Sequence, residues 1–462
     1  MERTYYPLTA AQKMHHHWIN RYHTQQVSGV SVVAALQAEL DMALLEKCLR
    51  EEICRYGCMR VRFTRPDKHG EVQQYIMKRD NRKLKTFDLS DLSMEKADEI
   101  MQGWAYETFE GDDVPMCEIR LMKLPEGYEG FFIHMDHRLI DSCGLVVMIN
   151  DVMKLYTHYR FQAPRPEPMA DYEEVLRTDL AKASRQKRFL KDKKFWEDQL
   201  DTWGEPLYSD IQGPKVLDRA RKKHNDPTLR AADIEMENLF VQVKDYVLEP
   251  EPTRRMMDFC QTHQISVTNL LLLGIRTYLS KVNNGQEDIT IQNFISRRST
   301  KAEWTSGGSR TIMFPCRTVM TPDTEFLDAA YEIQNVQNRI YLHSNYDPEL
   351  IVQEMKHRYH TPEHTSYESC YLTYQPMPVS VDNPYLEGIR THDRWFANGA
   401  ATKKMYLTVS HTPDGGTCFS FHYQTAHLCE KDMEIMYYYL MRVLFAGMED
   451  PEITLGEIME KV

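Results

Sequence analysis

Three prolines at alternate positions interrupt this chain within Ala163-Pro164-Arg165-Pro166-Glu167-Pro168. Proline fixes φ and lacks an N–H group, so the stretch cannot continue a helix and is typical of a semi-rigid linker. A chain of 462 residues is also too long for one ordinary hydrophobic core. We therefore predict two lobes, residues 1–165 and residues 166–462.

On both sides of the linker, helical and strand-like patterns alternate. Residues 42–56 carry apolar side chains at helical spacing, and residues 59–63 alternate as a strand does. Farther along, residues 266–282 predict a buried helix, the turn-forming residues 283–285 end it, and residues 288–296 predict a strand. We find no internal repeat, which excludes solenoids and propellers. These patterns predict a mixed α/β (α+β) fold.

Composition excludes several other classes of protein. Hydrophobic residues make up 42% of the chain and charged residues 27%, which is typical of packed globular proteins. No apolar run approaches the roughly 20 residues that span a bilayer, and the N-terminus has no secretory pattern, so we expect a cytoplasmic protein without a membrane anchor. The ten cysteines form no CxxC pairs, which argues against a zinc ribbon or a disulfide framework. A net charge of -12 argues against binding to nucleic acid.

Residues 130–144 are the most informative stretch for function. Residues 131–136 have the composition of a strand, and residues 145–156 have helical spacing. His137 is therefore expected where a strand ends, and Asp141 or Ser142 where a helix begins. Turns of this kind lift side chains out of a packed sheet into the clefts where α/β proteins place their chemistry.

An imidazole suits such a turn because its pKa of about 6.5 lets it accept a proton near neutral pH. Asp141 has two open roles: it caps the following helix, or it pairs with a distant arginine and locks the loop that holds His137. The HxxxD spacing by itself is weak evidence for catalysis, because a lone histidine at the end of a strand is more often a structural residue. A zinc site made of His134, His137 and Asp141 is disfavoured, because His134 and His137 point to opposite faces of a strand. We predict no metal.

The same segment resembles the HHxxxDG motif of the condensation domains of nonribosomal peptide synthetases. These domains belong to the wider chloramphenicol-acetyltransferase-like group of CoA-dependent acyltransferases. In this match His137 is the second, functional histidine and Asp141 is the aspartate. Asp136 stands where the first histidine usually is, and Ser142 stands where a glycine usually is.

Other segments are similar to the family in the same order along the chain. They are the opening Tyr6-Pro-Leu-Thr-Ala-Ala-Gln12, the turn Gly285-Gln-Glu-Asp-Ile289, Ser296-Arg-Arg298, Ile312-Met-Phe-Pro-Cys-Arg317, Tyr371-Leu-Thr-Tyr-Gln375 and the stretch from Phe419 or Phe421 to Leu428. Their order and spacing identify the chain as a member of the family over nearly its whole length.

The resemblance implies an architecture and a set of site residues. Two chloramphenicol-acetyltransferase-like lobes form a pseudo-dimer with a central tunnel, which the acyl donor and the acceptor enter from opposite sides. The expected partner of Asp141 is Arg297 or, failing that, Arg298. The residues expected to line the tunnel or its acceptor side are Asp136, Ser142 and Gly144.

The implied activity is that of a stand-alone condensation enzyme without a permanently bound cofactor. It transfers an acyl group from a phosphopantetheine thioester on a carrier protein, supplied in trans, to a small-molecule amine or alcohol, forming an amide or an ester. His137 is expected to assist the acceptor directly, with Cys143 packed rather than nucleophilic. Two alternatives stay open: an acyltransferase that takes its donor from acyl-CoA, and a non-catalytic protein that binds carriers and recruits other enzymes to them.

Three departures from the family pattern bear on this activity: Asp136, Ser142, and Ile312 in place of an asparagine. Asp136 adds negative charge beside His137 unless its side chain occupies the opposite face of the strand. A charged helix predicted over residues 171–200 is basic between Lys182 and Lys194, and it is either a solvated face or a docking patch for an acidic carrier. The trihistidine at 15–17 is expected on the surface or partly packed.

Overall fold

The computed structural model describes residues 3–80, 82–109, 113–377 and 383–462. The chain forms two compact units, each made of several segments. Unit 1 consists of Met1–Arg185, Ser296–Thr311 and Met377–Ala400. Unit 2 consists of Gln186–Ile295, Ile312–Pro376 and Ala401–Val462. The chain therefore returns twice to unit 1 after first leaving it.

A five-stranded sheet is the centre of unit 1. Its strand order is β14 (Thr391–Phe396), β2 (Gly29–Gln37), β7 (Tyr128–Asp136), β6 (Cys117–Lys123) and β5 (Lys85–Asp88). All neighbours are antiparallel except the parallel pair β5 and β6. A smaller sheet has the order β1 (Tyr6–Pro7), β4 (Gln73–Ile76) and β3 (Val61–Phe63).

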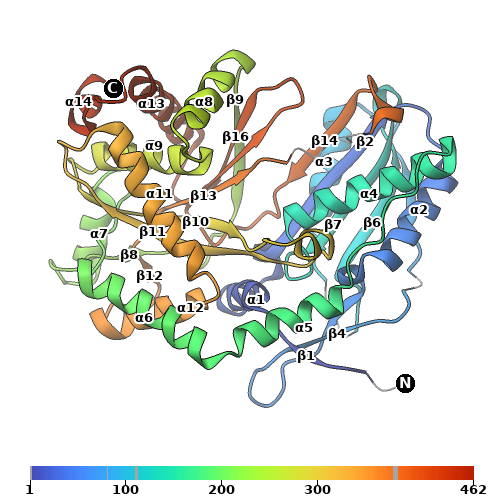
Figure 1. Ribbon diagram of the computed structural model, residues 1–462, viewed down its shortest axis with the longest axis horizontal. Helices are drawn as coiled ribbons and strands as arrows, with labels where there is room; N and C mark the ends of the chain where they lie inside the picture. Colours follow the sequence, from blue (N-terminus) through green and yellow to red (C-terminus); the bar gives the residue numbers. More distant parts are fainter. Residues whose placement is uncertain (1–2, 81, 110–112, 378–382) are drawn as a thin grey trace. The chain divides into compact units, whose positions relative to one another are not determined.

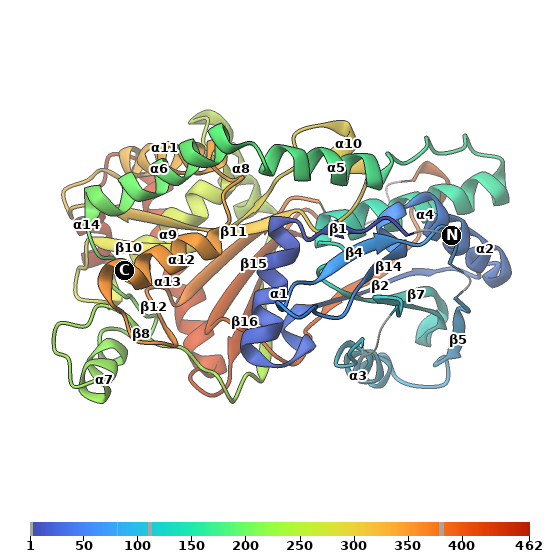
Figure 2. The ribbon, with the colours of Figure 1, turned by 90° about the horizontal axis from the view of Figure 1, so that it is seen from below.

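Helices cover both faces of the large sheet in unit 1, and Figure 2 shows α3 (Met94–Ala105) and α4 (Ser142–Phe161) on opposite sides of it. One hydrophobic cluster joins the sheet to α4 and to α2 (Met42–Arg55). A second cluster joins the other face to α3. Strand β7 is buried along its whole length because both of its faces are covered. The remaining helices of unit 1 are α1 (Ala10–Tyr22), α5 (Tyr172–Ala183) and α10 (Lys301–Thr305), with short turns η1 (Gln25–Ser28), η2 (Gly57–Arg60), η3 (Pro125–Gly127) and η4 (Pro384–Leu386).

Unit 2 is built on a six-stranded mixed sheet (Figure 1). Its order is β11 (Thr311–Val319), β10 (Asp288–Ser296), β13 (Cys370–Gln375), β15 (Met405–His411), β16 (Thr417–Gln424) and β9 (Val241–Leu248). Strand β13 is parallel to both β10 and β15, whereas β15, β16 and β9 are antiparallel. Two short strands, β8 (Ala232–Asp233) and β12 (Thr365–Ser366), form a separate pair.

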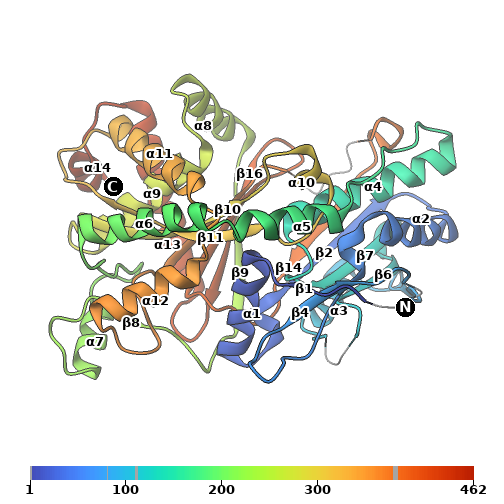
Figure 3. The same cartoon turned by 60° about the horizontal axis from the view of Figure 1, so that its bottom comes forward.

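The core of unit 2 is centred on α9 (Val267–Val282), which packs against α11 (Phe326–Leu342) and α13 (Glu430–Glu449). Gly274 allows α9 to approach α13 closely, because a Cβ atom there would lie 2.7 Å from side-chain atoms of Leu440 and Leu444. Helix α6 (Gln186–Trp203) runs beside β11 (Figure 3), and Trp196 stacks on Phe314. The other helices are α7 (Lys215–Lys223), α8 (Pro250–Thr262), α12 (Pro348–Tyr359) and α14 (Leu455–Lys461).

The predicted mixed α/β class is confirmed, and so are the helices and strands expected near residues 42–56 and 266–296. The charged helix predicted over residues 171–200 is two helices, α5 and α6, separated at Ser184 and Arg185. The lobe boundary drawn at the proline stretch also differs from the compact units. Unit 1 runs on to Arg185, because Tyr172 and Leu176 of α5 are part of its core. Within the described ranges, no helix is both long and apolar enough to cross a bilayer.

Candidate active site

The turn between β7 and α4 holds His137, as the sequence predicts. Strand β7 ends at Asp136, and α4 begins at Ser142 with Asp141 as its N-cap. The His137 backbone N–H donates to the Ser28 carbonyl over 2.6 Å, which ties the turn to the segment that enters β2. The His137 side chain is half-buried among neighbours that are almost all buried. The fold therefore holds His137 at the end of the strand as a partly exposed residue, with its ring Nδ1 buried.

Asp141 performs both of the roles that its sequence position left open. Its Oδ1 accepts the Gly144 N–H over 3.0 Å, which caps α4. Both carboxylate oxygens also accept from the Arg298 guanidinium, over 2.9 Å and 2.7 Å, in a bidentate pair. Both side chains are buried, at 0% exposure for Arg298 and 1% for Asp141. Such a pair fixes orientation as well as charge.

Further donors from one segment surround the same carboxylate. The backbone N–H groups of Arg310 and Thr311 donate to Asp141 Oδ2 over 2.9 Å and 3.0 Å, and so does the Thr311 hydroxyl, over 3.0 Å. Burial alone would raise the pKa of Asp141, but the charge and hydrogen bonds of Arg298 outweigh it, aided by the N–H groups of Gly144 and Arg310, and hold the pKa well below its usual range. Asp141 is thus a permanent anion with a structural role.

Arg298 has a second anchor in the loop that follows α10. Its Nη2 donates to the Gly308 carbonyl over 3.2 Å. Gly308 has φ +85°, and a Cβ atom there would lie 2.6 Å from the Tyr172 ring, so only glycine fits this turn. The resemblance puts Arg297 ahead of Arg298 as the expected partner of Asp141, and the structure assigns this position to Arg298 instead. Successive side chains in an extended segment point to opposite sides, so only one of two adjacent arginines can face Asp141.

Asp136 faces its own partner within the same turn. Its carboxylate oxygens accept from Arg138 Nε over 3.0 Å and from Arg138 Nη2 over 2.7 Å. The Arg138 guanidinium also lies over the Phe63 ring. The side chain of Asp136 is 1% exposed. The negative charge that replaces the first histidine is therefore neutralised by Arg138, a residue that no sequence motif singled out. A role for Asp136 in lining an acceptor channel stays a prediction.

The first residues of α4 complete the turn. A Cβ atom at Gly144 would lie 2.6 Å from Ile140, so this glycine is required for packing, and its carbonyl accepts from the Tyr56 hydroxyl. Ser142 is half-buried at the first position of the helix. Burial, with the adjacent Asp141 charge, raises the pKa of the Cys143 thiol to about 11, so the thiolate is scarce at neutral pH. Roles for Ser142 and Gly144 in the tunnel stay predictions.

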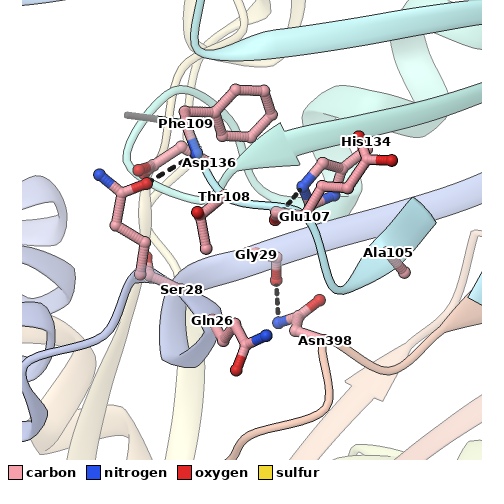
Figure 4. A pocket seen from close by; sticks show the side chains of 11 residues that line it. Gln26, Ser28, Gly29, Ala105, Glu107, Thr108, Phe109, His134, Asp136 and Asn398 are labelled. Atoms are coloured by element: carbon pink, nitrogen blue, oxygen red, sulfur yellow. Dashed lines mark hydrogen bonds between the residues drawn. The ribbon is translucent and has the colours of Figure 1, made fainter. Parts of the chain in front are cut away.

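His134 is engaged away from His137. Its Nδ1 lies 2.8 Å from Ser31 Oγ. Its Nε2 lies 2.8 Å from the Glu107 carbonyl oxygen, and Figure 4 draws His134 beside Glu107. The pocket drawn there, which Asp136 and Phe109 also line, has room for about one water molecule. In the described ranges, no group of three histidine, cysteine, aspartate or glutamate side chains is placed to hold a metal.

The three histidines of α1 lie in three different environments. His15 is 4% exposed, His16 is half-buried and His17 is exposed. Burial, with the nearby charge of Arg138, lowers the pKa of His16 to about 4, so its ring is neutral at physiological pH. The expectation of a surface or partly packed cluster is correct for His16 and His17 and wrong for His15. Helical spacing gives the reason, because the buried residues Ala11, Gln12, Met14 and His15 share one face.

Comparison with curated proteins finds synthases that are much longer than this chain. The chain is 22% identical to surfactin synthase subunit 1 of Bacillus subtilis (strain 168) over 469 residues, which cover 99% of this chain and 12% of that protein. It is 20% identical to tyrocidine synthase 2 of Brevibacillus parabrevis over 458 residues, which cover 99% of this chain and 12% of that protein. A plipastatin synthase protein of Bacillus subtilis (strain 168) is also 20% identical, over 98% of this chain and 17% of its own length. The chain thus spans less than a fifth of the length of these relatives.

Solved structures of condensation domains share the fold over 97–98% of this chain. They include the first condensation domain of the calcium-dependent antibiotic synthetase in complex with a substrate analogue (TM-score 0.78, 17% identity, 99% of that chain). They also include the starter condensation domain of rhizomide synthetase in complex with C8-CoA (TM-score 0.79, 16% identity, 97% of that chain). A third is VibH, a condensation enzyme (TM-score 0.74, 16% identity, 100% of that chain). The family model of the condensation domain matches residues 2–460. The chain belongs to the condensation domain family.

Proposed function

We propose that this chain is an acyltransferase that moves an acyl group from a phosphopantetheine thioester on a carrier protein to an amine or hydroxyl acceptor. The observation that carries the proposal is the half-buried imidazole of His137, which follows β7 directly. The Asp141–Arg298 pair, buried at the start of the next helix, keeps the turn in one conformation. Membership of the condensation domain family supports the reaction class.

In the proposed reaction, the acceptor nitrogen or oxygen attacks the thioester carbonyl carbon. His137 accepts the proton that the acceptor loses, the C–S bond breaks, and the pantetheine sulfur leaves with one proton to become a thiol. The products are an amide or ester and a free phosphopantetheine thiol. A positioned base of this kind contributes about 10²- to 10⁴-fold to the rate. No covalent acyl-enzyme is needed, since the thiol of Cys143 is protonated at neutral pH.

The donor has a second candidate in acyl-CoA. The rhizomide starter domain, which shares this fold, was crystallised with C8-CoA. CoA and carrier proteins present the same phosphopantetheine thioester, so the chemistry at His137 is common to both donors. The two candidates differ only in what surrounds the pantetheine arm.

The deciding experiment supplies acyl-loaded carrier protein and acyl-CoA in parallel, with a panel of amine and alcohol acceptors, and detects products by mass spectrometry. We expect product from the carrier-bound donor and a loss of about 10²-fold or more in His137→Ala. His17→Ala, on the exposed side of α1, is the matched control and should retain activity. Normal turnover by folded His137→Ala protein would contradict the mechanism. Tight binding of loaded carrier without product from any acceptor would favour the non-catalytic alternative.

A further inference from the structure

Helix α1 places a second imidazole face to face with His137. The ring centroids of His15 and His137 lie 4.2 Å apart, and the ring planes differ by 18°. This is a parallel stack, one of the arrangements that aromatic rings favour. The flat surface beside the His137 ring therefore comes from a helix about 120 residues earlier in the chain.

His15 is itself held from several directions. Trp18, on the next turn of α1, meets the His15 ring edge to face, with centroids 5.0 Å apart. The side chain of Gln12, one turn earlier, donates to the Arg138 carbonyl over 3.2 Å and to Gln74 Oε1 over 2.8 Å. Thr9 and Gln12 also form a capping box that fixes the start of the helix. The position of α1 is thus tied to the turn that carries His137, and His15 cannot swing away without disturbing these contacts.

We propose that His15 is a positioning residue, whose ring sets the plane of the His137 imidazole so that the reactive ring edge keeps one direction. This inference rests on the proposed function of His137. A base must meet the acceptor proton within hydrogen-bond reach, and a small misorientation is costly to proton transfer. A histidine at the end of a strand can rotate about both of its side-chain torsions. Stacking on a buried ring restricts that rotation.

The test compares two substitutions of His15 that both fill its space. His15→Phe keeps a flat aromatic face, whereas His15→Leu does not. We expect His15→Leu to lower kcat by about 10- to 100-fold with little change in KM, and His15→Phe to restore most of the loss. His17→Leu introduces the same change on the exposed face of α1 and should leave kcat unchanged. In parallel, the NMR signal of the His137 ring Cε1–H should shift in His15→Leu, because the stacked ring no longer shields it.

The outcomes separate this inference from the proposed function. Equal kcat values for His15→Leu and wild type, or an equal loss in His15→Phe and His15→Leu, would overturn the positioning role. A wild-type protein that gives no product with either donor would overturn the proposed function instead. The NMR signal still tests the stack in that case, because it needs no turnover: an unmoved His137 resonance in His15→Leu would overturn the inference.

Discussion

Asp136 and Arg138, which flank His137 in the sequence, bind each other through several hydrogen bonds, among them one from Arg138 Nε over 3.0 Å and one from Arg138 Nη2 over 2.7 Å. Asp136 is the departure from the family pattern that adds negative charge next to His137 in the sequence, and its pairing with Arg138 compensates that charge. A free carboxylate beside His137 would favour the protonated imidazole and so remove the base. Here the guanidinium compensates the charge within the same turn.

Removing Arg138 should therefore change the pH dependence of the reaction. In Arg138→Gln, the Asp136 carboxylate loses its partner, and we expect the acid limb of the activity profile to move to higher pH. The measurement is kcat/KM for acyl transfer from acid to mildly alkaline pH. The double variant Asp136→Asn/Arg138→Gln removes both charges and should return the acid limb of the profile to its wild-type position. Superimposable profiles for wild type and Arg138→Gln would show that the pair does not protect the base.

Removal of one partner of the Asp141–Arg298 pair should strongly destabilise the fold. Asp141→Asn leaves the buried Arg298 without its carboxylate partner, and the guanidinium stays charged because arginine is effectively always protonated in proteins. Breaking a buried pair in this way costs about 3–5 kcal/mol. Urea unfolding followed by circular dichroism would measure it. The matched control is Glu167→Gln, which breaks the exposed ion pair with Lys301 and should leave the midpoint unchanged. Similar midpoints for the two variants would refute the structural role of the pair.

The lowered pKa of Asp141 also predicts how the free energy of unfolding changes at acid pH. The pKa of Asp141 is lower in the folded than in the unfolded chain, where it is about 3.9. The folded state therefore binds fewer protons at this group, and its stabilising contribution is complete above about pH 5 and declines as the pH falls below about 4. We expect the difference in unfolding free energy between wild type and Asp141→Asn to be constant from neutral pH to about pH 5 and to shrink below about pH 4. An increase of this free-energy difference as the pH falls would contradict the prediction.

The basic patch predicted between Lys182 and Lys194 is smaller than its composition suggests. On α6, Arg188, Lys193 and Lys194 pair with carboxylates one helical turn away. Lys187 and Lys191 are exposed and form no ion pair within the part of the chain that the structure describes. Together with Arg185, which is also exposed, they are the charges of this patch best able to attract an acidic carrier protein.

Reversing two of these charges should raise KM for a carrier-bound donor and leave folding intact. The variant is Lys187→Glu/Lys191→Glu, and the effect should weaken with added salt, since the Debye length is about 10 Å at 0.1 M. The control Lys68→Glu/Lys83→Glu changes the net charge equally on exposed residues of unit 1. Equal changes in KM for the two variants, or no change at low salt, would show that α6 is an ordinary solvated surface.

Local patterns predicted the elements around the site but not the contacts between them. The end of β7, the start of α4 and the cap at Asp141 follow from the apolar spacing of residues 131–156 and the capping preference of aspartate. The choice between Arg297 and Arg298 depends on the twist and exit direction of β10, which a single sequence does not contain. The burial of His15 could have been predicted from helical spacing, because His15 lies three residues after Gln12 on the same face of the helix.

The division of the chain was the least predictable feature. The prolines at 164–168 are a real break after α4, but the chain stays in unit 1 for one more helix. Strand β14 then joins the edge of the unit 1 sheet by pairing with β2, more than 350 residues away in sequence. Pairings over such distances leave no local signal, because they depend on which edge strand is open once the rest has folded.

The discontinuity of unit 1 has a practical result for anyone who wishes to isolate it. A fragment ending at Arg185 would keep His137, Asp136 and Arg138, yet it would lack the segment Ser296–Thr311. Asp141 would then hold an anionic side chain in the interior without the Arg298 guanidinium and without two of its three backbone donors, and only the Gly144 N–H would remain. Expression of the site on its own therefore requires a redesigned connection that carries residues 296–311 and β14 back to the first segment.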